Sequence, residues 1–93
     1  MKKNKSFVIR NIASEIMLVP TDETARDFNG MINLSDTAAF IWNHIEETRS
    51  FGELIDLILQ EYDIDRETAA QDASAFLMEL LERDMVKPSG QSW

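Results

Sequence analysis

Apolar and polar positions alternate with a period of two along the first third of the chain, which is typical of β-strands. Three short runs rich in β-branched, aromatic or alternating residues occur there, at residues 6–12, 15–19 and 28–34. Pro20 ends the second run because it has no N–H to donate to a neighbouring strand, and the polar residues 21–27 predict a loop. The three runs therefore predict a small antiparallel meander.

The period then changes to 3.6, and three candidate helices follow, each starting at a residue that can cap the first turn. These caps are Ser35, Ser50 and Asp65. In the third and longest helix, ending at Arg83, the expected buried stripe consists of Ala69, Ala73, Phe76, Leu77, Leu80 and Leu81. Residues 85–87 predict a short terminal strand before Pro88.

This order of elements predicts an α+β fold of the winged-helix-like type. A three-stranded antiparallel sheet comes first and is followed by three helices, which must cover one face of the sheet to give it a core. The chain has 93 residues, so we expect a single domain over residues 1–93 with an ordered core at about residues 6–87.

The charge balance excludes several classes of partner. Seventeen acidic residues against nine basic ones give a formal net charge of -8, which repels phosphate backbones and anionic lipid surfaces. We therefore expect no nucleic acid and no membrane among the partners. The chain has no cysteine and no apolar run approaching the ~20 residues of a membrane span, so a cytoplasmic protein is the simplest interpretation.

Residues suited to catalysis are scarce. The chain has one histidine, His44, and three glycines that lie too far apart to form a phosphate-binding loop. Asp63 and Asp65 resemble the start of a calcium loop, but the glycine and the glutamate that such a loop needs are missing. We expect no enzymatic activity, no metal and no cofactor.

A DNA-binding winged helix is the first alternative. Its recognition helix should present basic or amide side chains to the major groove. The third helix instead carries Arg66, Gln71 and Arg83 among six carboxylates, which disfavours contact with phosphates.

A peptide-binding site needs only an edge strand and a groove, because an extended peptide can add to the unpaired edge of a sheet. Gly30 lies within the third predicted strand, and a glycine there marks a bend or a close approach of another backbone. The candidate peptide-binding residues on this strand and on the third helix are Phe28, Asn29, Gly30, Met31, Ile32, Asn33, Asp72, Phe76, Glu79, Leu80 and Arg83.

Several segments together resemble the PqqD-like family of peptide-recognition proteins. They are residues 34–42, 49–54, 61–65, 72–77 and 80–81, supported by the first hairpin. The resemblance implies a non-catalytic recognition element that binds the leader of a ribosomally made precursor peptide as an added strand, between the third strand and the third helix. It also implies presentation of that peptide to a maturation enzyme, such as a radical S-adenosylmethionine enzyme.

The resemblance leaves the pathway and the assembly open. The segment before the third strand lacks the proline-glutamate-glycine sequence of the pyrroloquinoline quinone (PQQ) proteins, so another modified peptide is an equal alternative. A winged-helix transcriptional regulator and a scaffold module for the modifying enzyme are the remaining functional alternatives. The exposed edge is compatible with a monomer or with a weak dimer.

Overall fold

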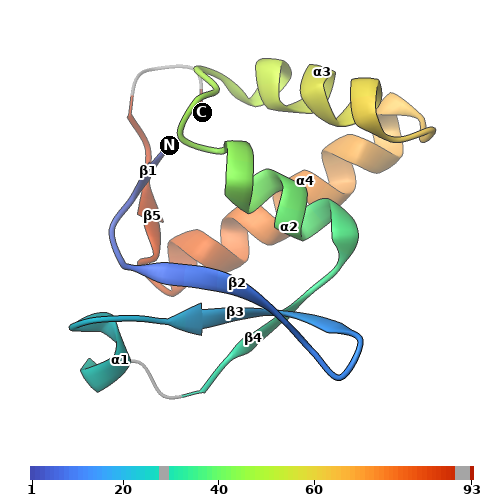
Figure 1. Ribbon diagram of the computed structural model, residues 1–93. Helices are drawn as coiled ribbons and strands as arrows, with labels where there is room; N and C mark the ends of the chain where they lie inside the picture. The colour runs from blue at the N-terminus through green and yellow to red at the C-terminus, as the bar shows by residue number, and fades with distance from the viewer. Residues whose placement is uncertain (28–29, 90–92) are drawn as a thin grey trace.

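The first two apolar runs pair as an antiparallel hairpin in the computed structural model, which describes residues 1–27, 30–89 and 93 (Figure 1). The strands are β2, Phe7–Ile12, and β3, Glu15–Pro20. Ala13 and Ser14 join them with φ angles of 52° and 67°. Two-residue hairpin turns use this left-handed region because it matches the twist of the paired strands.

A third strand, β4 (Ile32–Leu34), completes the sheet in the order β2-β3-β4. Its residues pair antiparallel with β3, so that Leu34 lies opposite Ile16 and Ile32 lies opposite Leu18. Three helices cover one face of this sheet (Figure 1). The predicted α+β class with a three-stranded antiparallel sheet is therefore confirmed.

The three long helices begin where their caps predict. They are α2, Asp36–His44, α3, Phe51–Glu61, and α4, Arg66–Glu82. Each cap side chain accepts a hydrogen bond from the backbone N–H three residues later, at 3.1 Å for Ser35, 3.1 Å for Ser50 and 2.7 Å for Asp65. These bonds satisfy N–H groups that have no partner inside the helix. No helix in the described part of the chain is both long and apolar enough to cross a membrane.

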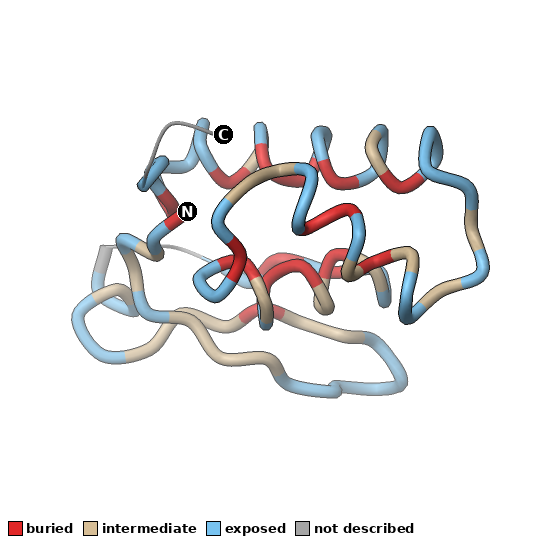
Figure 2. Tube along the Cα trace, turned by 90° about the horizontal axis from the view of Figure 1, so that it is seen from above, coloured by how far each residue is buried: buried red, intermediate tan, exposed pale blue. Residues whose placement is uncertain are grey.

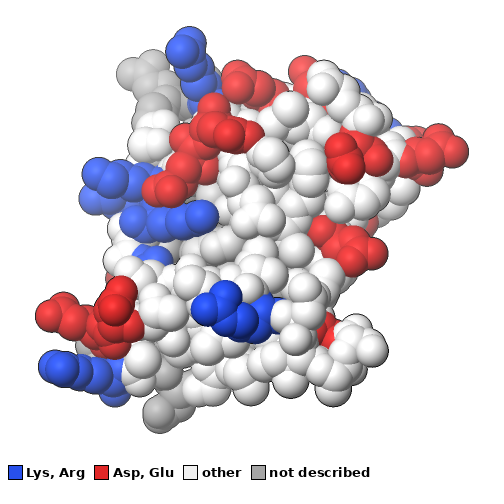
Figure 3. Space-filling model, viewed as in Figure 1, with Lys and Arg blue, Asp and Glu red and all other residues white. Residues whose placement is uncertain are grey.

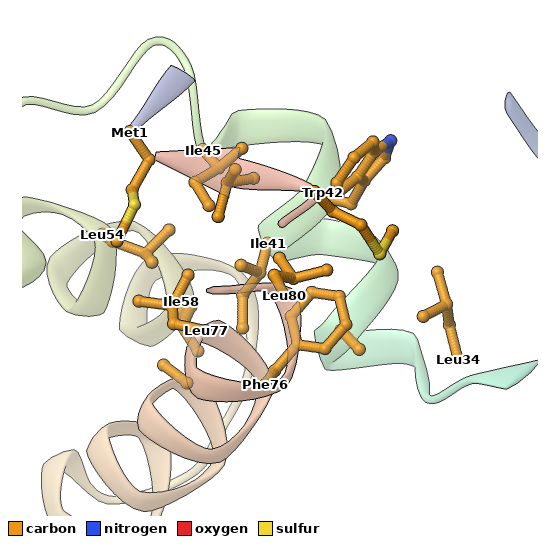
Figure 4. Packing of buried hydrophobic residues seen from close by; sticks show 14 of the residues in the cluster. Met1, Leu34, Ile41, Trp42, Ile45, Leu54, Ile58, Phe76, Leu77 and Leu80 are labelled. Carbon is orange, nitrogen blue, oxygen red and sulfur yellow. The ribbon is translucent and has the colours of Figure 1, made fainter. Parts of the chain in front are cut away.

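The core lies between the sheet and the helices. Figure 2 shows that the buried stretches of the long helices face the interior of the molecule. Side chains from α2, α3 and α4 interdigitate there, as the close view of Figure 4 shows. The sheet contributes Leu18, Ile32 and Leu34, and the helices contribute Ile41, Trp42, Ile45, Leu54, Ile55, Ile58, Phe76, Leu77 and Leu80.

The chain start forms a second, two-stranded sheet that the sequence did not predict. β1 (Lys2–Lys3) pairs antiparallel with β5 (Val86–Lys87), the terminal strand expected after the third helix. Met1 is buried in the core with 5% of its surface exposed. The Nζ atom of Lys3 lies 4.4 Å from the centroid of the Trp42 ring, a cation–π geometry.

Three further expectations were wrong in detail. The segment 21–27, expected as a loop, contains a one-turn helix, α1 (Thr24–Asp27). The third strand is shorter than residues 28–34, because Gly30 takes a φ of 95° that interrupts the extended backbone, and residues 28–29 lie outside the described part. Leu81, expected in the buried stripe, is 39% exposed because it lies 100° around α4 from Leu80.

Candidate functional site

The three-stranded sheet has two edges, β2 and β4. The hydrogen-bonding pattern within the sheet decides which backbone N–H and C=O groups point outward on each edge. In an antiparallel pair, hydrogen-bonded and non-hydrogen-bonded pairs alternate along the strands. The two-residue turn makes Ile12 and Glu15, which flank it, a hydrogen-bonded pair. At the other end of the hairpin the backbone N–H of Thr21 donates to the carbonyl of Ser6 at 2.9 Å, in phase with that pair.

This phase places the backbone groups of Asn33 on the free edge of β4. On β3, Ile16 and Leu18 belong to the alternate set, so their N–H and C=O groups face β4. Their partners on β4 are Leu34 and Ile32, which therefore use their backbone groups within the sheet. Asn33 lies between them and directs its N–H and C=O groups outward. Among the described strands none pairs with that side of β4.

The β2 edge is protected by a side chain. The same alternation places the carbonyl of Ile9 on the outer edge of β2. The Nη1 atom of Arg10 donates a hydrogen bond to that carbonyl at 3.2 Å. Charged side chains along an edge are a common protection against the addition of another strand. The β4 edge at Asn33 is therefore the better place for an extended peptide to pair.

A groove of about 390 Å³ opens directly beside β4. Its walls come from β4, from the first turns of α2 and from one face of α4. Figure 4 shows Phe76 projecting from α4 toward α2, with Ile41 and Leu34 nearby. The residues that line the groove are Ile32, Asn33, Leu34, Ser35, Thr37, Ala38, Ile41, Asp72, Ala75, Phe76 and Glu79. The floor is mainly apolar, and polar side chains surround it.

The predicted site residues separate into four groups. Those brought together in the groove are Ile32, Asn33, Asp72, Phe76 and Glu79. Gly30 and Met31 are exposed and precede the groove without lining it. Leu80 has no exposed surface and belongs to the core, and Arg83 lies beyond the groove at the end of α4. Phe28 and Asn29 lie outside the described residues.

The first turns of α2 are the part of the groove that the site prediction missed. Ser35, Thr37, Ala38 and Ile41 line it because α2 begins immediately after β4 and turns back across its end. The signal was present, since a helix that follows an edge strand without a loop must start beside that strand. Ala75 was also missed, although it lies next to Phe76 on α4.

Among the described residues, one of the two carboxylates that line the groove is paired with a basic side chain and the other is not. Glu79 forms an ion pair with Arg83, whose Nη2 atom lies 3.4 Å from Glu79 Oε1, one helical turn away. Asp72 is exposed and forms no ion pair or hydrogen bond with any described residue. Figure 3 shows basic side chains gathered on the side of β1 and β5 and carboxylates mostly over the helices. The groove therefore carries an excess of negative charge near Asp72.

Among the described residues, the groove lining contains neither histidine nor cysteine. His44 pairs through Nδ1 with Glu47 on the surface, away from the groove-lining residues. No group of three or more potential metal ligands occurs within the described ranges 1–27, 30–89 and 93. An apolar floor beside a free strand edge is instead a geometry for holding an extended chain.

Known proteins resemble this chain in sequence and in fold. Residues 10–86 match the family model described as "Coenzyme PQQ synthesis protein D (PqqD)". The fold is similar to the solved structure "TbiB1 in Complex with the TbiA(beta) Leader Peptide", with 25% sequence identity and a TM-score of 0.66. That match covers 98% of this chain and 100% of the other. No curated protein matches the chain. Because the family model spans most of its length, the chain belongs to the PqqD family.

Proposed function

We propose that this protein binds the leader of a ribosomally synthesised precursor peptide as an added strand on the β4 edge. The observation that carries the proposal is the outward-facing backbone of Asn33, which lies beside a groove walled by α4. The similar TbiB1 structure, by its description, holds a leader peptide. A bound leader extends the sheet from three strands to four and covers the apolar floor of the groove.

Backbone and side chains have separate tasks in this proposal. The N–H and C=O groups of Asn33 hydrogen-bond to the backbone of the leader, an interaction that any sequence except proline can make. Selectivity comes from the groove, where Phe76 and the exposed Ala75 offer apolar surface to leader side chains. Burial of such side chains supplies the larger share of the affinity.

The protein itself makes and breaks no bond in this proposal. The chemistry belongs to a separate maturation enzyme, for which radical S-adenosylmethionine enzymes are one class. Holding the leader fixes one end of the precursor and raises the local concentration of its remaining part near that enzyme. PQQ synthesis, named in the family description, and the maturation of another modified peptide use the same recognition step.

The location and assembly follow from the same mechanism. Precursor peptides are made by ribosomes, so we infer that the protein acts in the cytoplasm. A dimer formed through the β4 edge competes with leader binding for the backbone of Asn33. The protein therefore acts as a monomer, or as a weak dimer that the leader dissociates.

An NMR titration tests the proposal directly. The ¹⁵N-labelled protein is titrated with synthetic leader peptides of the precursors encoded beside it. We expect shifts of amide signals concentrated on Ile32–Leu34 and on residues 72–79 of α4. Shifts confined to β2 indicate binding at the other edge. A folded sample with no shift at any peptide concentration contradicts leader binding.

A further inference from the structure

The β4 edge fixes which leader side chains enter the groove. The leader residue paired with Asn33 through two backbone hydrogen bonds directs its side chain to the same face of the sheet as Asn33, away from the groove. Its two neighbours lie opposite Ile32 and Leu34, whose side chains are buried on the groove side. The bound segment therefore presents two side chains, spaced two residues apart, to the apolar floor.

Asp72 adds a charge requirement to this pattern. Asp72, Phe76 and Glu79 recur at i, i+4 and i+7, so they lie along one face of α4. Glu79 is already compensated by Arg83, whereas Asp72 has no cationic partner in the described part of the chain. A bound leader that covers the groove removes water from around Asp72, which penalises an unpaired carboxylate.

We propose that Asp72 is a specificity-determining residue, which selects leaders that carry a lysine or arginine next to an apolar-x-apolar pair. This inference rests on the proposed leader binding at the same groove. Asp72 and Phe76 are separated by about 6 Å along the helix axis. An extended residue spans about 3.3 Å, so the basic residue lies within about two or three positions of the side chain over Phe76.

A lysine or arginine fits this position better than a short polar residue. Its aliphatic part packs on the apolar surface of the groove while the charged end reaches the exposed carboxylate. The net charge of -8 adds a long-range attraction for basic segments, but that attraction acts on any basic peptide. Only a contact at Asp72 depends on the register of the leader.

The test measures leader affinity by fluorescence anisotropy with a labelled synthetic leader of the neighbouring precursor. The protein variants are Asp72→Lys, Asp72→Asn and the control Glu82→Lys. Glu82 is exposed on the same helix and does not line the groove. Glu82→Lys changes the net charge by the same amount as Asp72→Lys. We expect Asp72→Lys to weaken binding about tenfold and Asp72→Asn about threefold, with less than about a twofold change for Glu82→Lys.

A charge exchange identifies the partner residue. Each basic residue of the leader is replaced by glutamate in turn, and one of these peptides should recover affinity for Asp72→Lys while losing it for the unchanged protein. Equal affinities of Asp72→Lys and the unchanged protein overturn the inference but leave leader binding standing. A bound segment without any basic residue also overturns it. If the unchanged protein binds no leader, the proposed function fails together with the inference.

Discussion

The backbone N–H of Thr21 donates to the carbonyl of Ser6 at 2.9 Å and closes the β2–β3 hairpin at the end opposite its turn. Together with the Ala13-Ser14 turn, this bond fixes the phase of the whole sheet. It follows that neighbouring residues of β4 have different tasks. Ile32 uses its backbone groups toward β3, and Asn33 directs its groups toward a ligand.

Asn33→Pro should therefore lower leader affinity without unfolding the protein. Proline removes the outward N–H of Asn33 and is tolerated on the free side of an edge strand. The loss of one backbone hydrogen bond, about 1 kcal/mol, predicts a weakening of at least about fivefold. Isothermal titration calorimetry with the leader peptide measures the affinity, and circular dichroism checks the fold.

Two neighbouring substitutions serve as controls. Asn33→Ala keeps the backbone donor and should leave the affinity nearly unchanged. Ile32→Pro removes a backbone N–H that pairs with β3 and also replaces a buried side chain. It should therefore lower the thermal midpoint of unfolding, which Asn33→Pro should not. Unchanged affinity of a folded Asn33→Pro variant contradicts strand addition at β4.

Ala75→Trp should block the groove and leave the core intact. Ala75 is exposed on α4 and lines the groove, so an indole there occupies the space of a leader side chain. We expect at least about a tenfold loss of leader affinity, the size typical of a central interface contact. Ser74→Trp is the matched control because Ser74 is exposed but lies 100° around the helix, outside the groove. Equal affinities of the two variants place the leader elsewhere.

The parts of the fold that depend on local pattern were predictable from the sequence. Capping residues and apolar periods act within a few residues, so the three long helices and the first hairpin were predicted close to their observed bounds. The β1–β5 pair was not, because Lys2–Lys3 is too short to show a period and its partner lies at the other end of the chain. Gly30 shortened the third strand through a backbone conformation that its neighbours do not specify.

The sequence predicted the two walls of the candidate site, β4 and α4, but neither the burial of Leu80 nor the contribution of α2. The prediction from an edge strand and the third helix included five residues that do lie together in the groove. Leu80 was an error of helical phase, since one residue beyond Glu79 turns a side chain by 100° into the core. The contribution of α2 depends on how the helix turns after β4, which is a tertiary relationship.

Gly30→Ala should lower the free energy of unfolding by about 1–2 kcal/mol, the cost of a left-handed backbone for a residue with a Cβ atom. The φ of Gly30 is 95°, and beyond its chain neighbours no atom of the described residues lies within 4 Å of the position of an added Cβ, so the cost comes from the backbone conformation and not from packing. Gly52→Ala should stabilise by about 0.5–1 kcal/mol, because Gly52 lies in α3 and an added Cβ comes no closer than an ordinary van der Waals contact, 4.0 Å, to Ser50 Oγ. Urea unfolding measures both free energies, and equal changes for the two variants contradict a conformational cost of alanine at position 30.

Ionisation of Asp65 should make the free energy of unfolding decrease as the pH falls into the acidic range. Hydrogen bonds from the Thr68 side chain, and then from the Thr68 backbone N–H, hold the pKa of Asp65 below its usual value. Because the pKa is lower in the folded state, the ionised cap stabilises the fold fully above the unfolded pKa of about 3.9. That contribution is lost as the pH falls through the lower pKa of the folded protein.

Asp65→Asn separates this contribution from those of the other carboxylates. Asparagine caps a helix about as well as aspartate but does not titrate, so stability at pH 7 should change little. Urea midpoints measured from pH 7 to pH 2 should then fall less steeply for Asp65→Asn than for the unchanged protein, so that two curves lying close together at pH 7 separate at the acidic end. Parallel curves over the whole range contradict an ionised cap at α4, since both proteins would then lose stability only through groups they share.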